Sequence, residues 1–185
     1  MLTRIARSVN IAVQVAMLGF EKSYKSGESV DSIMGYVDCL TGISNRAAFE
    51  RDRAGVDDSY SLIMIDVDDF KSINDSRGHL QGDNILRRLA SILSQAVAPL
   101  GRAYRFAGDE FVLVVPRREA VFLCNAIRDY MKKRESFTVS QGVVLNLNQG
   151  LTNDALTTVD SALSKSKKHG KCNITMVVPA PNQAA

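Results

Sequence analysis

The sequence predicts an α/β (α+β) fold, and three observations support that prediction. Apolar runs of strand length occur at residues 61–67, 103–106 and 111–115. Between and after these runs, apolar residues recur three and four positions apart, which is the period of a helix that packs on a sheet. A short glycine-containing turn joins the second and third runs, so these two are expected to pair as a hairpin.

The first half of the chain is predicted to contain a helix, a strand and a second, longer helix. Ser44 is expected to cap a helix that runs to about Arg53, and residues 61–67 are expected to form a buried strand. The long helix is indicated by one apolar face and by the proline that follows it. That face consists of Ile85, Leu86, Leu89, Ile92, Leu93 and Val97, ahead of Pro99.

The second half continues the alternation of strands and helices. Pro116 opens a helix that closes at residues 132–134, where lysine and arginine suit a helix C-terminus. A strand is expected at residues 137–145, followed by a helix that runs from a cap at Asn153 or Asp154 to Gly170. A last strand is expected at residues 174–178. The order βαββαβ followed by αβ is the ferredoxin-like arrangement with a C-terminal αβ extension.

The bulk composition is that of one globular domain with an appendage. The chain has 185 residues, 45% of them hydrophobic, which suffices for a well-formed core. Residues 38–179 are predicted to form the domain and residues 180–185 a tail. The net charge of +3 is too small for a general nucleic-acid footprint, so no nucleic-acid partner is expected. Three cysteines without paired spacing, and no recognisable signal peptide, favour a cytoplasmic protein.

Residues 1–37 are predicted to form an N-terminal amphipathic helix and a linker. The apolar stripe of this helix consists of Leu2, Ile5, Val9, Ala12, Ala16 and Gly19. Three roles are open: packing on the protein's own domain, a short coiled-coil seam that promotes a homodimer, or weak association with a membrane surface. The charge-free stretch at residues 8–20 is shorter than the roughly 20 apolar residues that span a bilayer, so no transmembrane segment is expected.

Acidic residues follow the first predicted strand and fill the hairpin turn. Asp66 ends the strand, while Asp109 and Glu110 stand between the two hairpin strands. In the predicted strand order these two places lie side by side at one edge of the sheet. Oxygen-only ligands of this kind suit Mg²⁺ or Mn²⁺, which also bind substrate phosphates. The alternative for Asp66 is a strand-end acid that caps the following turn.

The segment after Asp66 has residues that suit a nucleotide. A short turn of helix would place Lys71 and Asn74 on one face, beside free backbone N–H groups that attract phosphate. The carboxylate of Asp83 is able to accept two parallel hydrogen bonds from the edge of guanine, a pair of donors that adenine lacks. The alternative for Asp83 is an acid that stabilises the N-terminus of its helix.

At this point the sequence resembles the GGDEF domains, the diguanylate cyclases that condense two GTP into cyclic di-GMP. Residues 38–46 with Phe49 are similar to the family opening DxLTGLxNRxxF, and residues 66–75 to its DxDxFKxxND segment. Residues 78–83 with Leu86 are similar to GHxxGDxxL. Residues 107–111 read AGDEF and resemble the motif that gives the family its name. The resemblance implies the palm type of fold shared by nucleotide cyclases.

The resemblance also implies a role for each matching residue. The metal ligands would be Asp66, the Val67 carbonyl, Asp109 and Glu110, of which Asp109 and Glu110 would also be catalytic. The substrate would be bound by Lys71, Asn74, Asp83, Ala107, Gly108, Lys167 and Lys171, with lysines on the triphosphate and with Asn74 and Asp83 on guanine. Which of the two catalytic acids helps to deprotonate the attacking 3′-hydroxyl stays open. Each domain would hold one GTP, so that a homodimer completes the reaction by two-metal phosphoryl transfer.

One position of the motif departs from the family pattern. Ala107 replaces the first glycine of the turn, and a positive φ angle at this position would cost alanine on the order of 1 kcal/mol. A second hypothesis follows from this departure: a catalytically silent GGDEF-like domain that binds GTP or a protein partner in a regulatory role. Ala98 and Gly101 stand where many relatives carry the RxxD product-inhibition site, so feedback through that site is not expected.

Overall fold

The computed structural model describes residues 35–98, 100–147 and 150–179. The chain divides into two units, Met1–Val37 and Asp38–Ala185, and all of the elements named below lie in the second. The predicted N-terminal helix and the tail at residues 180–185 lie outside the described residues. Among the residues that are described, no helix is long and apolar enough to cross a membrane.

The second unit has the predicted ferredoxin-like core. Its elements are β2 (Tyr60–Val67), α5 (His79–Val97), β3 (Arg102–Ala107), β4 (Glu110–Pro116), α6 (Arg117–Arg134) and β5 (Val139–Val144). The four strands lie in the order β3-β4-β2-β5, and all neighbours among them are antiparallel. The α/β fold class and the βαββαβ order are therefore confirmed.

Further elements extend the core at both edges. A short strand, β1 (Ser44–Asn45), pairs parallel with β3, and the last strand, β6 (Ile174–Val177), pairs parallel with β5. The remaining helices are α3 (Arg46–Asp52), the 3₁₀ turn η1 (Arg53–Gly55), α4 (Phe70–Arg77) and α7 (Asn153–Lys168). The sheet thus has six strands in the order β1-β3-β4-β2-β5-β6.

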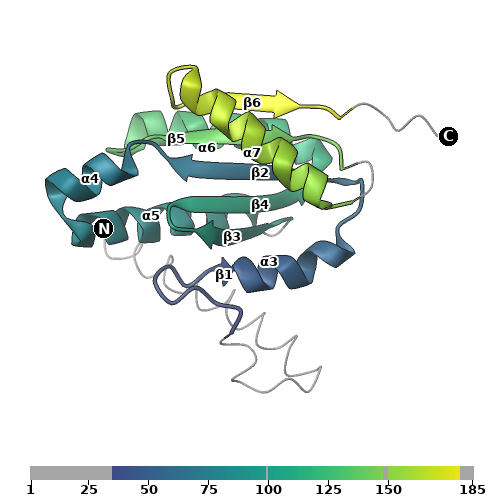
Figure 1. Ribbon diagram of the computed structural model, residues 1–185, viewed down its shortest axis with the longest axis horizontal. Helices are drawn as coiled ribbons and strands as arrows, with labels where there is room; N and C mark the ends of the chain where they lie inside the picture. Colours follow the sequence, from purple (N-terminus) through teal and green to yellow (C-terminus); the bar gives the residue numbers. More distant parts are fainter. Residues whose placement is uncertain (1–34, 99, 148–149, 180–185) are drawn as a thin grey trace. The chain divides into compact units, whose positions relative to one another are not determined.

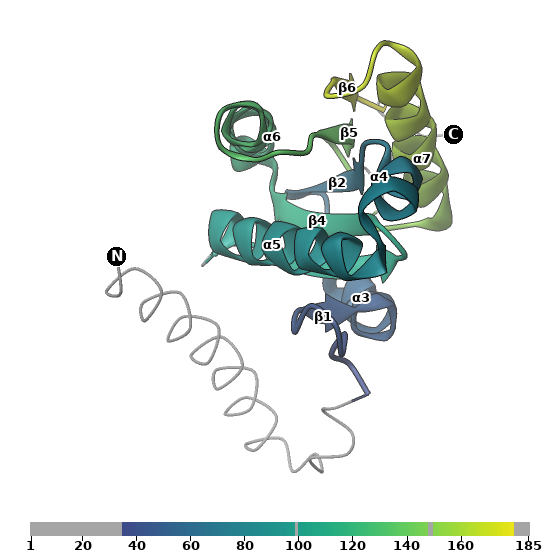
Figure 2. The same cartoon turned by 90° about the vertical axis from the view of Figure 1, so that its left-hand side faces the viewer.

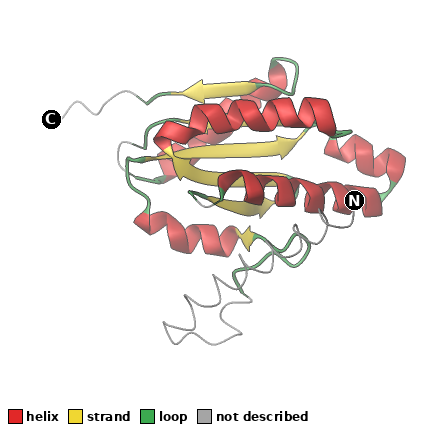
Figure 3. Cartoon of the chain, turned by 180° about the vertical axis from the view of Figure 1, so that it is seen from behind, coloured by secondary structure: helices red, strands yellow, loops and turns green. Residues whose placement is uncertain are grey.

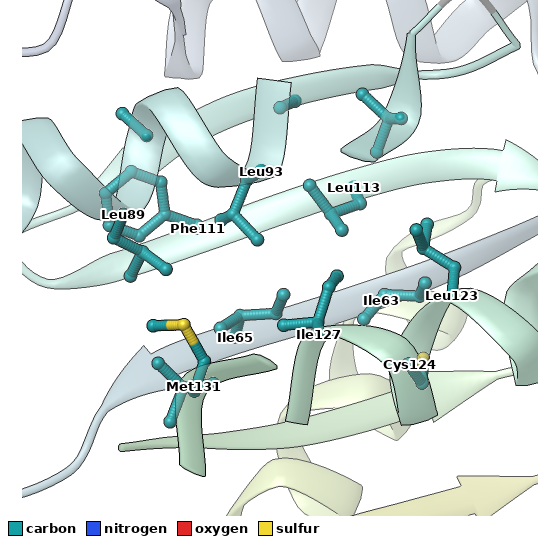
Figure 4. Packing of buried hydrophobic residues seen from close by; sticks show 14 of the residues in the cluster. Ile63, Ile65, Leu89, Leu93, Phe111, Leu113, Leu123, Cys124, Ile127 and Met131 are labelled. Atoms are coloured by element: carbon teal, nitrogen blue, oxygen red, sulfur yellow. The ribbon is translucent and has the colours of Figure 1, made fainter. Parts of the chain in front are cut away.

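Helices cover both faces of the sheet (Figures 1 and 3). Figure 2 shows α5 and α6 on one face and α7 on the other. Because side chains alternate along a strand, odd-numbered residues of β2 and β4 face α5 and α6. Ile65, Phe111, Leu89 and Met131 meet there in the buried core, close to the end of β2 that carries the acids (Figure 4). Even-numbered residues, including Asp66, face α7.

Two helix starts differ from the sequence prediction. Ser44 lies in β1 opposite Tyr104, so Asn45 caps α3 instead, and its side chain accepts a hydrogen bond from the Ala48 N–H at 3.0 Å. Likewise, Thr152 rather than Asn153 or Asp154 caps α7, because its hydroxyl accepts from the Ala155 N–H. In both cases the residue that caps is the neighbour of the predicted one, which moves the helix start by one or two positions.

Candidate functional site

The strand register brings the predicted acids to one end of the sheet. Asp66, near the end of β2, lies directly opposite Glu110, the first residue of β4, and Asp109 precedes Glu110 in the hairpin turn. Both strand positions are even-numbered and therefore face α7. Figure 1 shows the end of β2, the β3–β4 turn, the start of α4 and the α7–β6 turn at the same end of the domain.

A lysine from α7 completes this acidic group. The Nζ atom of Lys167 lies 2.7 Å from Oδ2 of Asp66, whose residue surface is only 5% exposed. Burial raises the pKa of Asp66 to about 6; the hydrogen bond from Lys167 opposes this rise, and the negative charges of Asp109 and Glu110 add to it. Burial and Asp109 also raise the pKa of Glu110. The site therefore holds more negative charge than one lysine balances.

The donor set is of the type that Mg²⁺ and Mn²⁺ prefer, namely carboxylate and backbone oxygens without sulfur or imidazole. Asp66, Glu110 and Asp109 are close enough for their charges to act on one another, and Val67 is buried at the last position of β2. In the part of the chain that the structure describes, no three acidic, histidine or cysteine side chains already surround one point. The residues thus fit a divalent cation by type, charge and location, and one of the two Asp66 oxygens, Oδ2, is paired with Lys167.

Ala107 carries no backbone strain in the hairpin turn. Among the described residues other than glycine, a positive φ occurs at Asp69, Lys171 and Cys172 and at no other position. Ala107 instead ends β3 opposite Glu110, and the left-handed position in the turn belongs to Gly108, with φ of 38°. A Cβ atom on Gly108 would meet nothing within 4 Å, so the turn is open on that side.

An arginine that the sequence reasoning missed holds this turn. Arg105 donates from Nε and Nη2 to the Gly108 carbonyl at 3.0 and 2.8 Å, and from Nη1 to Asp38 Oδ1 at 3.0 Å. Asp38 also accepts from the backbone N–H and hydroxyl of Thr41. Burial would raise the pKa of Asp38, but the hydrogen bonds from Thr41 and Arg105 outweigh it and hold the pKa below its usual value. The first residues of the domain are thereby joined to the acidic turn.

The junction of α4 and α5 places the two predicted guanine-binding residues near each other. The side chain of Asn74 lies against Gly82, which precedes Asp83, and Asn74 Oδ1 is buried with no hydrogen-bond partner. Asp83 is half-exposed, and its closest cation is Arg87 at 3.9 Å. A buried carbonyl oxygen without a donor is costly, and this one is covered by Gly82, so the Asn74 side chain must turn before the oxygen meets a ligand.

The two other predicted lysines are placed differently. Lys71 is exposed on α4 and borders a shallow hollow lined by Asp69, Lys71, Ser72, Asp75 and Ser76. Lys71 and Asn74 both lie on α4, three positions apart and thus on one side of the helix as predicted, although Asn74 does not line this hollow. Lys171, in the α7–β6 turn, pairs with Asp69 at the start of α4 rather than with Asp66.

Fold and site together define an α/β domain of ferredoxin-like topology with an acidic site at the strand ends. The family model described as "Diguanylate cyclase, GGDEF domain" matches residues 35–173, and the chain belongs to this family. It is 34% identical over 149 residues to the diguanylate cyclase DgcM of Escherichia coli K12, covering 72% of this chain and 36% of that protein. It is 33% identical over 153 residues to VdcA of Vibrio cholerae, covering 72% of this chain and 44% of that one. The chain thus spans less than half the length of these relatives.

Solved structures agree with this assignment. The GGDEF domain of DgcB from Caulobacter crescentus in complex with c-di-GMP has a TM-score of 0.61 and 26% identity, covering 77% of this chain and 93% of that one. The diguanylate cyclase SiaD from Pseudomonas aeruginosa, in complex with its activator SiaC, has a TM-score of 0.69 and 26% identity, covering 95% of this chain and 73% of that one.

Proposed function

We propose that the protein is an active diguanylate cyclase that condenses two GTP molecules into cyclic di-GMP. The observation that carries this proposal is the buried Asp66, set opposite Glu110 and paired with Lys167 at the end of the sheet. A purely structural acid would not need an excess of negative charge around it, whereas a magnesium–triphosphate site does. Family membership supports the same reaction.

In the proposed site, this chain's residues divide the work between metal and nucleotide. Asp66, the Val67 carbonyl, Asp109 and Glu110 would hold Mg²⁺ or Mn²⁺, which would lower the pKa of the attacking 3′-hydroxyl and balance charge on the phosphates. Lys71, Lys167 and Lys171 would bind the triphosphate, and Asn74 and Asp83 would bind guanine. The open side of the turn at Ala107 and Gly108 leaves room for the substrate.

Lys167 would serve two partners in turn. Without nucleotide it neutralises Asp66, and with nucleotide bound it would turn to the triphosphate, leaving the Asp66 oxygen to the cation. Because each domain would hold one GTP, two domains must face each other for reciprocal attack. We therefore propose a homodimer as the catalytic form.

The direct test is to incubate the purified chain with GTP and Mg²⁺ and to identify the product by mass spectrometry. We expect cyclic di-GMP from the natural chain and none from Asp109→Ala, which should remain folded because Asp109 lies in a turn at the domain surface. Saturable GTP binding without product would instead indicate the silent regulatory domain.

Restoring glycine at position 107 should change little. Because Ala107 has no positive φ, an Ala107→Gly variant relieves no strain, and it should lower the free energy of unfolding by about 0.5 to 1 kcal/mol through added freedom of the unfolded chain. Turnover of GTP should stay within a factor of about three, which corresponds to less than 1 kcal/mol. A large gain in turnover would show that the alanine methyl itself limits the natural chain.

A methyl group at Gly82 should weaken binding of guanine nucleotides. Its Cβ would lie 2.0 Å from Asn74 Oδ1 and 3.2 Å from Phe70 Cζ, so a Gly82→Ala variant must displace the Asn74 side chain. We expect about a tenfold loss of GTP affinity in titration calorimetry, the equivalent of one lost hydrogen bond. The exposed Asn84→Ala variant on the same helix is the matched control and should bind GTP normally. An unchanged affinity in Gly82→Ala would remove Asn74 from the guanine site.

A further inference from the structure

The acidic run that includes Asp66 contains a second buried carboxylate, Asp68, to which the proposed reaction assigns no role. Asp68 is 6% exposed, and among the described residues no cation lies within ion-pair distance of it, although the charge of Lys171 acts on it from farther away. Its oxygens accept three hydrogen bonds, from the hydroxyls of Thr138 and Ser140 at 2.7 and 2.6 Å and from the backbone N–H of Cys172 at 2.9 Å. A buried carboxylate held by neutral donors alone is an expensive feature, which calls for a reason.

The third donor belongs to a strained turn. Between α7 and β6, three consecutive residues have left-handed backbones: Gly170 with φ of 100°, Lys171 with 57° and Cys172 with 48°. One glycine would suffice to end the helix, whereas Lys171 and Cys172 adopt this conformation against the preference of their side chains. Such strain persists only where surrounding contacts fix the backbone, and the described contact on the Cys172 amide is Asp68.

The strained turn carries a charge toward the proposed site. Three contacts join the acidic run to the end of α7 and the turn: Asp66 with Lys167, Asp68 with the Cys172 N–H, and Asp69 with Lys171. In the middle contact Asp68 is held from the other side by Thr138, just before β5, and by Ser140 in β5. The side chains of Lys167 and Lys171 are each nearly half exposed, so both lysines are able to exchange partners.

We infer that Asp68 is a positioning residue, which holds the turn at residues 170–172 so that Lys171 meets the phosphates of the bound nucleotide. This inference rests on the proposed function. Asp68 itself touches no substrate; it acts through the Cys172 amide. When nucleotide binds, Lys171 exchanges Asp69 for a phosphate, while the turn stays in place because Asp68 retains its three donors.

The test compares a nucleotide with phosphates to one without. Binding of guanosine and of a GTP analogue with a methylene group between the α and β phosphorus atoms is measured for each variant in the presence of Mg²⁺. The variant is Asp68→Ala, which removes both oxygens and leaves the Cys172 N–H without its acceptor, whereas an asparagine oxygen in place of Oδ2 would still accept from Cys172 and Thr138. We expect about a tenfold loss of affinity for the analogue and none for guanosine. A general structural defect would weaken both ligands alike.

Two further variants keep the inference open to refutation if Asp68→Ala does not fold. Lys171→Met changes an exposed side chain and should weaken binding of the analogue by a similar factor, again sparing guanosine. Lys168→Met removes the same charge from a neighbouring exposed position and should leave both affinities unchanged. In the Lys171→Met background, Asp68→Ala should add little, because both variants act through the contact of Lys171 with phosphate.

The outcomes separate the two proposals. If the natural chain fails to bind the analogue, the proposed nucleotide site itself is wrong. If the natural chain binds it and Lys171→Met binds it equally well, or if Asp68→Ala weakens guanosine as much as the analogue, the positioning role of Asp68 is overturned while the proposed function stands.

Discussion

An Asp66→Asn variant is expected to lose cyclic di-GMP synthesis and, near pH 7 without metal, to be more stable than the natural chain. Asp66 is buried among Asp109, Glu110 and a single lysine, so its negative charge is unfavourable in the folded state. Asparagine removes that charge and also removes the oxygen that would bind metal. Function and stability are expected to change in opposite directions, as is common where an active site is built from groups that repel each other.

The raised pKa of Asp66 determines how the free energy of unfolding changes with pH. The pKa of Asp66 rises from 3.8 to about 6 on folding, so between these values the folded state binds more protons than the unfolded state. Stability therefore falls as pH rises through this window and stays reduced above it. In Asp66→Asn this decrease should be absent, with a gain on the order of 3 kcal/mol at pH 7.

Urea unfolding at several pH values, with a chelator present, measures both quantities. Asp129→Asn on α6 is the matched control, since Asp129 is half-exposed, and it should keep the natural pH profile and the natural turnover. An Asp66→Asn variant that is less stable than the natural chain at pH 7 would contradict this prediction, because the charge of Asp66 would then stabilise the folded state.

The second large effect is expected at Gly142 in β5. A Cβ atom there would lie 2.3 Å from the Val159 carbonyl oxygen and 2.4 Å from the Leu163 nitrogen, both in the backbone of α7. A backbone cannot rotate away, so Gly142→Ala must push α7 from the sheet. We expect a loss of about 3 kcal/mol in the free energy of unfolding, which is the upper range for an overpacked core.

Function should fall with stability in this variant, because α7 carries Lys167 to Asp66. Thermal unfolding and GTP affinity are both measured. Gly55→Ala is the matched control: its Cβ would meet nothing within 4 Å, and its φ is not positive, so neither quantity should change. Equal behaviour of the two alanine variants would show that the close approach of α7 to β5 is not needed.

Local patterns sufficed to predict most of the fold. The prediction depends on the apolar faces of α5 and α6 and on the apolar runs in β2 and β4. These residues are buried in the core, and residues buried on one face recur with the period of their helix or strand. The helix caps were missed by one or two residues. At α3 the choice between Ser44 and Asn45 depends on whether Ser44 pairs with Tyr104 in the sheet, and local sequence does not contain that information.

The candidate site, like the fold, was predicted only in part from the sequence. The meeting of Asp66 with the hairpin acids follows from strand order alone and was predicted. The contact of Arg105 with Asp38 and the Gly108 carbonyl was missed, because Arg105 stands in a strand and gives no signal until the chain is folded. Asp68 was likewise part of a recognised segment, but its role depends on residues 70 or more positions away. The sequence raised a positive φ angle at Ala107 as a source of strain, but the left-handed residue of the turn is Gly108.

The measurement that tests the central claim most directly is the rate of cyclic di-GMP formation from GTP and Mg²⁺ over a range of protein concentrations, with the oligomeric state determined in parallel. We expect product from the natural chain, a turnover per chain that rises with concentration as dimers form, and no product from Asp109→Ala. Absence of product from a dimeric, GTP-saturated sample of the natural chain would contradict the claim that this site is a working cyclase.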